Sequence, residues 1–236
     1  EEFPDEERAV TALEDLFERL GRWRELETSL RERLGQADHP DQRTDVRLRL
    51  ARLSEVQLGR PELALEQLRE LLADAPNHAA AAAEFERLLR AAGSHEELAS
   101  WLEQRAVAAR ASGDSGDKAR AEQVLRALSE LYEQQLGDPQ RAIVANLQRY
   151  EFAPELPVVK ELVRLYEVTG ELARVAEFME IQIGLEPPHQ GLAAAHALAD
   201  LAATRLRDPE LVQRALLAAR KISPRDPQTI AKLRQH

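Results

Sequence analysis

Residues 136–142 read Leu-Gly-Asp-Pro-Gln-Arg-Ala, a segment that combines the end of one helix with the beginning of the next. A glycine tolerates the left-handed conformation in which many helices end, an aspartate caps the free N–H groups of the following helix, and a proline suits its first position. Related segments stand at residues 58–64 and 206–212, although the second of these lacks the glycine. In each copy another proline follows fifteen residues after the first. The sequence therefore predicts three helices that begin and end at equivalent positions.

A second type of turn alternates with the first and is centred on Gly21, Gly93 and Gly170. These glycines are 72 and 77 residues apart, and the first prolines of the other turn type are 78 and 70 residues apart. Self-similarity at a fixed spacing is the signature of a repeat architecture. The sequence therefore predicts a repeating unit of about 75 residues that contains two helical hairpins.

The composition favours an all-α fold. Alanine, leucine, arginine and glutamate are good helix formers and are abundant, whereas only 4% of the residues are aromatic, which disfavours a β-rich fold. We therefore expect an α-solenoid of about six antiparallel helical hairpins. The expected helices span residues 7–20, 22–35, 41–58, 61–74, 78–92, 95–111, 117–136, 139–152, 156–169, 171–184, 189–206 and 209–222.

The whole chain, residues 1–236, is expected to form one solenoid, as a fragment of a longer repeat protein. Both ends resemble interrupted repeats, and position 1 is not a methionine. The expected units cover roughly residues 5–76, 77–154 and 155–225, and residues 226–236 begin a further repeat.

The hydrophobic pattern predicts one apolar face on each helix. Apolar side chains recur at helical spacing in two matching helices, as Leu13, Leu16, Phe17 and Leu20 in one and Leu162, Leu165, Tyr166 and Thr169 in the other. Helices of this length are marginally stable alone, so each must bury its apolar face against the next hairpin. Trp23 and Trp101 are expected to pack between repeats, although an exposed tryptophan would instead anchor a partner.

The charge and cysteine content restrict the partners. The net charge of −10 argues against binding of nucleic acid, which depends on clustered lysine and arginine. The absence of cysteine excludes disulfides and thiol chemistry and leaves a bacterial cytoplasm or periplasm equally open. No apolar run is long enough to span a membrane, so direct membrane insertion is not expected.

Catalytic and metal-binding patterns are weak, and we expect no enzyme activity, cofactor or metal. None of the six histidines pairs with another at a spacing of three or four residues. Glu130 and Glu133 could be an acid/base pair of a glycosidase, but such pairs are common on charged helix surfaces. Neither a glycine-rich phosphate loop nor a serine, histidine and aspartate arrangement is present.

The aligned hairpins resemble the tetratricopeptide repeat. The resemblance is carried by small residues in first helices, an aromatic residue, alanines in second helices and closing prolines, namely Ala51, Ser129, Ala199, Tyr132, Ala64, Ala142, Pro76, Pro154 and Pro224. The match covers the whole chain but is degenerate, because Glu14 and Glu86 stand where a small residue is expected.

This resemblance implies a right-handed superhelix whose first helices line a concave groove for a protein or peptide partner. The groove positions carried over from the family alternate in charge, and the candidate partner-binding residues are Arg52, Glu55, Arg87, Arg90, Arg126, Glu130, Glu133, Arg164, His196 and Asp200. A mixed-charge ligand would fit such a groove. The clamp for a C-terminal carboxylate that some family members carry is not supported, because asparagine is missing from the corresponding positions.

Three functions remain open from the sequence. The favoured one is a non-enzymatic scaffold that holds a peptide or helix of a protein partner in the mixed-charge groove. An alternative is a structural spacer or self-associating segment of the parent protein, which would allow a homo-oligomer. A third is the helical module of an enzyme that acts on a cell-wall polymer or sugar.

Overall fold

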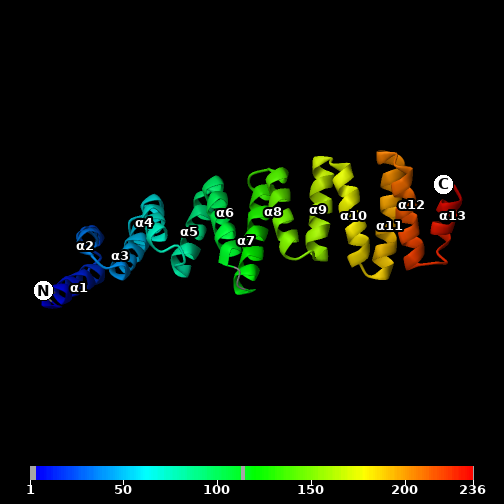
Figure 1. The fold of residues 1–236 in the computed structure, drawn as a ribbon. Helices are drawn as coiled ribbons and strands as arrows, with labels where there is room; N and C mark the ends of the chain where they lie inside the picture. Colours follow the sequence, from blue (N-terminus) through cyan, green and yellow to red (C-terminus); the bar gives the residue numbers. More distant parts are fainter. Residues whose placement is uncertain (1–3, 113–114, 236) are drawn as a thin grey trace. The chain divides into compact units, whose positions relative to one another are not determined.

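The structure, a computed structural model, describes residues 4–112 and 115–235 and contains α-helices joined by short turns (Figure 1). Thirteen α-helices lie in the described residues: α1 (Pro4–Arg19), α2 (Trp23–Gln36), α3 (Pro40–Arg52), α4 (Pro61–Asp74), α5 (Ala79–Ala92), α6 (His95–Ser112), α7 (Ser115–Gln134), α8 (Pro139–Phe152), α9 (Leu156–Thr169), α10 (Leu172–Leu185), α11 (Pro188–Leu201), α12 (Pro209–Ile222) and α13 (Pro227–Gln235). Two helices continue into π-helical segments, α3 into η1 (Leu53–Gln57) and α11 into η2 (Ala202–Leu206). The predicted all-α hairpin fold is confirmed. When η1 and η2 are counted with α3 and α11, each predicted helix begins and ends within three residues of its observed bounds.

The chain divides into two compact units, an N-terminal unit of residues 1–98 and a C-terminal unit of residues 99–236. The boundary falls inside α6. In the N-terminal unit, α1 packs against α2, α2 against α3, α3 against α4, and α4 against α5. In the C-terminal unit, the helices α7 to α13 pack in the same sequential way. That all residues form one solenoid stays a prediction.

The turn segments adopt the conformations that their residues predict. The side chain of Asp138 accepts a hydrogen bond from the backbone N–H of Arg141 at 3.0 Å and so caps α8. Gly137 has a φ of 64°, in the left-handed region that suits glycine. The third copy has Arg207 at this place, with a φ of 54°, so an arginine adopts the conformation that favours glycine.

The cores consist mostly of leucine and alanine side chains from consecutive helices. In the N-terminal unit a buried cluster is formed by Leu26, Leu30, Val46, Leu50 and Leu53. Trp23 is half-buried and packs against this cluster, in agreement with its predicted place between repeats. Trp101 is also half-buried, and the guanidinium of Arg105 lies 5.9 Å from the centre of its ring.

The apolar face predicted for α1 is wrong in part. Leu13, Leu16 and Leu20 are 45%, 48% and 61% exposed, whereas Glu14 is fully buried. In α9 the matching leucines are buried because both α8 and α10 pack against that helix. Among the described residues, α1 packs against α2 on the side that carries Glu14, and its leucines are left exposed.

Two arginines neutralise the buried carboxylate of Glu14. Its Oε2 atom accepts hydrogen bonds from Arg33 Nη1 at 2.9 Å and from Arg49 Nη1 at 2.7 Å. A buried charge is tolerated when it is paired and hydrogen-bonded in this way. The glutamate that departs from the repeat pattern thus links α1 to α2 and α3.

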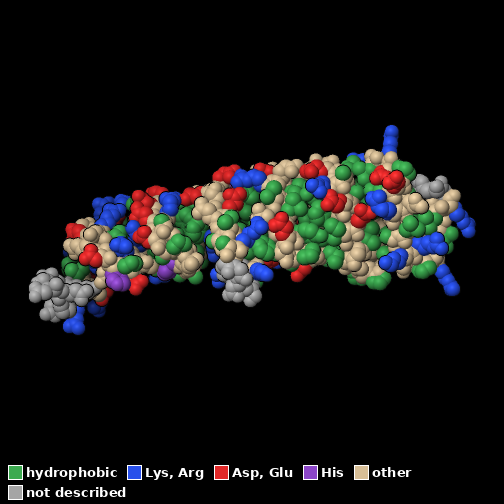
Figure 2. Space-filling model, viewed as in Figure 1, with side chains coloured by type: hydrophobic (Ala, Val, Ile, Leu, Met, Phe, Trp, Pro, Cys, Tyr) green, Lys and Arg blue, Asp and Glu red, His purple; other side chains and the backbone are tan. Residues whose placement is uncertain are grey.

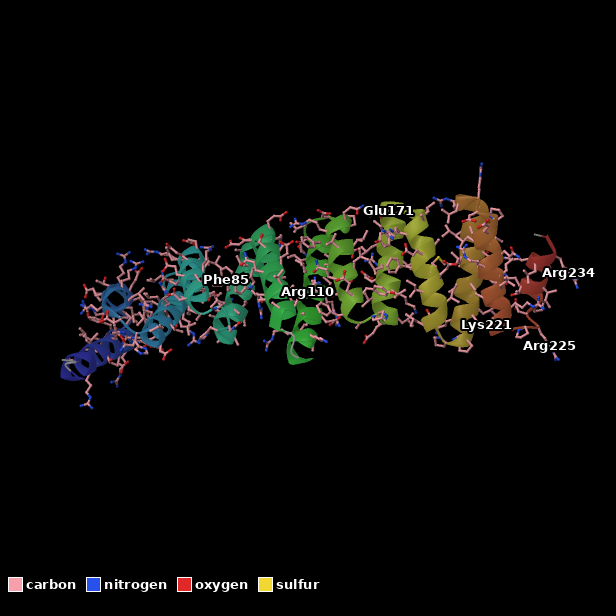
Figure 3. All side chains as sticks on the ribbon, viewed as in Figure 1. Phe85, Arg110, Glu171, Lys221, Arg225 and Arg234 are labelled. Atoms are coloured by element: carbon pink, nitrogen blue, oxygen red, sulfur yellow. The ribbon has the colours of Figure 1, made fainter. Side chains whose placement is uncertain are left out.

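Further polar contacts join neighbouring hairpins at the surface of the C-terminal unit (Figure 3). Arg110 Nη2 lies 3.2 Å from Glu151 Oε2, and its guanidinium lies over the ring of Phe152. Glu171 Oε1 accepts a hydrogen bond from Gln140 Nε2 at 3.0 Å, which connects the beginning of α8 to the beginning of α10. These exposed contacts each contribute modestly to stability.

Candidate partner-binding site

A polar pocket of about 620 Å³ lies in the C-terminal unit between α7 and α9, the first helices of two consecutive hairpins. The second helix α8 contributes one residue to it. The pocket is lined by Arg126, Ser129, Glu130, Glu133 and Gln134 of α7, Arg149 of α8, and Pro157, Glu161 and Arg164 of α9. Three arginines and three glutamates therefore face one small volume.

Four of the ten predicted groove residues line this pocket, namely Arg126, Glu130, Glu133 and Arg164. Four others belong to the N-terminal unit, with Arg52 on α3, Glu55 on η1, and Arg87 and Arg90 on α5. The remaining two, His196 and Asp200, lie on α11 and do not line the pocket. Whether any of the ten binds a partner stays a prediction.

The glutamate and arginine side chains of consecutive first helices form the same ion-pair arrangement in both units. In the C-terminal unit Arg164 bonds to Glu133 of the preceding first helix and to Glu161 one turn earlier in α9. Hydrogen bonds from this arginine hold the pKa of Glu133 below its ordinary value. These contacts fix the wall of the pocket on the α9 side.

The equivalent arrangement in the N-terminal unit uses Arg87 of α5, which bonds to Glu55 and to Glu84. The hydrogen bond from Arg87 lowers the pKa of Glu84. Arg90 is exposed and lies 3.6 Å from Glu86 Oε2. Four of the ten predicted groove residues are therefore paired with one another, Glu55 with Arg87 and Glu133 with Arg164. Figure 2 likewise shows acidic and basic side chains interspersed along the visible surface.

His196 was expected to face the groove, but it is buried and only 8% exposed. Its Nε2 atom lies 2.8 Å from the hydroxyl of Thr229 and 3.3 Å from Asp226 Oδ2, at the beginning of α13. Asp200 of α11 forms an ion pair with Lys232, which also belongs to α13. His196 therefore offers no exposed surface to a partner in this structure, because α13 covers it.

A polar network that the sequence analysis missed includes two residues of the pocket lining, Ser129 and Arg149. Asn146 Nδ2 donates hydrogen bonds to Ser129 Oγ at 2.6 Å and to the carbonyl of Ala142 at 3.1 Å. Arg149 Nη1 donates to Asn146 Oδ1 at 2.7 Å, and Arg149 Nη2 donates to Glu122 Oε1 at 2.7 Å. An alignment of the hairpin copies could have found this network, because Ser129, Asn146 and Arg149 occupy positions that hold apolar residues in the other copies.

The carboxylate of Glu122 is stabilised by two arginines at once. Partial burial raises its pKa, but hydrogen bonds from Arg149 and Arg126 outweigh this effect, so the pKa lies below its ordinary value. In turn, the hydrogen bond to Glu122 raises the pKa of Arg126. The network is therefore ionised at neutral pH and presents fixed charges to the pocket.

The described residues were also compared with the requirements of a metal site and of a membrane-spanning helix. No group of three or more histidine, cysteine, aspartate or glutamate side chains in residues 4–112 and 115–235 could hold a metal ion. His78 instead caps α5, since its Nδ1 atom accepts a hydrogen bond from the backbone N–H of Ala81 at 3.1 Å. No helix in these residues has the length and apolar character needed to cross a membrane.

No protein-family model and no curated protein matches the chain. Similar solved structures include PilF of Pseudomonas aeruginosa, with 17% identity, a TM-score of 0.36 and coverage of 97% of each chain. YrrB, a tetratricopeptide repeat protein with an unusual peptide-binding site, has 17% identity, a TM-score of 0.39 and coverage of 81% of this chain and 91% of its own. A tetratricopeptide repeat protein of Parabacteroides merdae has 16% identity, a TM-score of 0.39 and coverage of 98% and 84%. The similarity concerns the helical-hairpin fold alone.

Proposed function

We propose that the chain is a non-enzymatic scaffold that binds a segment of a protein partner in the pocket between α7 and α9. The observation that carries this proposal is the pocket of about 620 Å³ in which three arginines and three glutamates meet. Its size suits a few side chains of a polypeptide. Its mixed charge suits a segment that carries both acidic and basic residues.

The contacts of the pocket support binding without reorganisation. Arg164 is held by Glu133 and Glu161, and Arg126 is held by Glu122. Side chains that are fixed before binding lose little conformational entropy when a partner arrives. Glu130 forms no ion pair with any residue that the structure describes, so its carboxylate is available to a basic side chain of the partner.

The test is a selection of short peptides from a random library against the whole chain, followed by affinity measurements at low and high salt. We expect the selected peptides to carry mixed charge and to bind more weakly at high salt, because salt screens exposed charges. The variant Glu130→Lys should weaken binding about tenfold, which corresponds to one lost charge-assisted contact.

The matched control is Glu66→Lys, which makes the same charge change at an exposed position of α4 outside the pocket. This variant should bind the peptides as the original chain does. Equal affinity of the two variants would contradict a binding site in the pocket, and a selection without any binder would contradict the scaffold function.

A further inference from the structure

The three hairpins that contain the proline turns bury different kinds of side chain at equivalent positions. The pairs α3/α4, α7/α8 and α11/α12 align on Pro61, Pro139 and Pro209. At the positions of Ser129, Asn146 and Arg149, the first hairpin has Ala51, Leu68 and Leu71, and the third has Ala199, Leu216 and Ala219. These six apolar residues are all at most 2% exposed. The hairpin fold therefore forms twice in this chain without a polar network.

The network is costly for the fold of the middle hairpin. Arg149 is only 7% exposed, and desolvation of a guanidinium and its partner carboxylate offsets much of their attraction. Apolar residues of suitable volume often replace a buried ion pair with no loss of stability or with a gain. Stability alone thus gives no reason for an arginine at this position.

The guanidinium of Arg149 retains binding capacity. It has five N–H groups. Nε and Nη2 each donate one hydrogen bond to Glu122, and Nη1 donates one to Asn146. The other two N–H groups form no hydrogen bond with a described residue, and Arg149 lines the pocket. A largely buried guanidinium that lines a pocket and has two further N–H donors is suited to a carboxylate, which accepts charge-assisted hydrogen bonds from arginine.

We propose that Arg149 is the recognition group of the pocket and that it binds the side-chain carboxylate of an acidic residue in the partner segment. Glu122 and Asn146 act as positioning residues, since their contacts fix the plane of the guanidinium. Glu130 takes a basic residue next to the acidic one, so that the two charges of the segment are both compensated. This inference rests on the proposed function and names the chemistry that the pocket selects.

The pocket charges favour a carboxylate over a phosphate group. Together with Glu122, four glutamates surround three arginines, so the site carries an excess of one negative charge. A doubly charged phosphate group would be repelled by this excess negative charge, and one neighbouring basic residue would not neutralise its two charges. A singly charged carboxylate with a neighbouring basic residue adds no net charge.

The test uses a variant in which the middle hairpin receives the core of α11/α12. This apolar-core variant carries Glu122→Leu, Ser129→Ala, Asn146→Leu and Arg149→Ala, the residues found at 192, 199, 216 and 219. Because the whole network is replaced together, no buried polar partner is left behind. A second variant, Arg149→Lys, keeps the charge but removes the planar fork.

The probes are acetylated and amidated versions of a selected peptide, one with its acidic residue and one with glutamine or asparagine in its place. Blocked ends remove the C-terminal carboxylate as a source of binding. We expect the neutral peptide to bind the original chain between about tenfold and a hundredfold more weakly than the acidic one. The apolar-core variant should bind both peptides equally weakly, and Arg149→Lys should lose most of the preference.

Two results would overturn the inference. If the apolar-core variant prefers the acidic peptide as strongly as the original chain does, the carboxylate is bound elsewhere. If the original chain binds both peptides equally while Glu130→Lys still weakens binding, the pocket binds peptides but does not select a carboxylate at Arg149. The second result leaves the proposed function intact, whereas a failure of all peptides to bind overturns both.

Discussion

The second helices of hairpins α7/α8 and α11/α12 begin at equivalent prolines and have the same length, but the cores of the two hairpins differ. The first buries Asn146 and Arg149, and the second buries Leu216 and Ala219 at the same places. The turns and helix lengths therefore depend on residues other than these core positions. The difference teaches that one hairpin fold accommodates two kinds of core, and that the polar one coincides with a pocket.

The comparison can be tested by introducing an arginine into the apolar core of α11/α12 without the polar partners that Arg149 has in α7/α8. In Ala219→Arg the new guanidinium would meet Leu192 and Leu216, at the positions of Glu122 and Asn146. An uncompensated buried charge should lower the free energy of unfolding by about 3–5 kcal/mol. Urea-induced unfolding followed by circular dichroism measures this change.

The control is Leu217→Arg, which introduces the same side chain at a position of α12 that is 49% exposed. A change within about 0.5 kcal/mol is expected there. If Ala219→Arg lowers the free energy of unfolding no more than the control does, a buried arginine does not need the polar partners that Arg149 has.

A smaller effect on stability is expected from substitutions in the turns of the same two hairpins. Arg207 has a φ of 54°, and Gly137, at the equivalent position, has a φ of 64°. Relief of the left-handed strain outweighs the entropy cost of glycine, so Arg207→Gly should raise the free energy of unfolding by up to about 1 kcal/mol. Gly137→Ala should lower it by about 1 kcal/mol. The control is Arg207→Ala, which removes the guanidinium but keeps a Cβ atom, and it should not raise the free energy of unfolding measured by thermal unfolding. If Arg207→Ala stabilises the chain as much as Arg207→Gly does, the backbone of Arg207 is not strained.

The smallest effect is a pH dependence that only the polar hairpin should show. The pKa of Glu122 is lowered from its ordinary value of 4.5 in the folded chain, so its contribution to stability is complete above that value and is lost as the pH falls through the lowered one. The original chain should therefore lose more stability than the apolar-core variant between about pH 6 and about pH 3.5.

Urea midpoints of both proteins at the two pH values measure the difference. Glu84 and Glu133, whose pKa values are also lowered, are present in both proteins and cancel. Parallel losses in the two proteins would show that Glu122 does not contribute.

Much of the fold could be predicted because its signals are local. Gly137, Asp138 and Pro139 act within one turn, and their copies mark the other hairpins. Burial depends on distant neighbours and was harder to predict. The leucines of α1 have the spacing of a core face but remain exposed, and His196 is covered by Thr229, which is 33 residues away in sequence.

The candidate site was predictable only where its residues stand on exposed faces of first helices. Glu133 and Arg164 were placed on such faces from the repeat pattern, and the structure brings them together. Arg149 was missed because it belongs to a second helix, at a position that is core in the other copies. Its contact with Glu122 joins residues 27 apart in sequence and follows from the packing of α8 against α7.

The central claim is that the polar core of α7/α8 serves binding and not folding. The most direct test compares the free energy of unfolding of the original chain and the apolar-core variant in urea at neutral pH. We predict that the variant is at least as stable, because a buried ion pair replaced by packed apolar residues is often neutral or stabilising by about 1–4 kcal/mol. A variant that unfolds more easily by more than about 1 kcal/mol would contradict the account, since the network would then be needed for the fold itself.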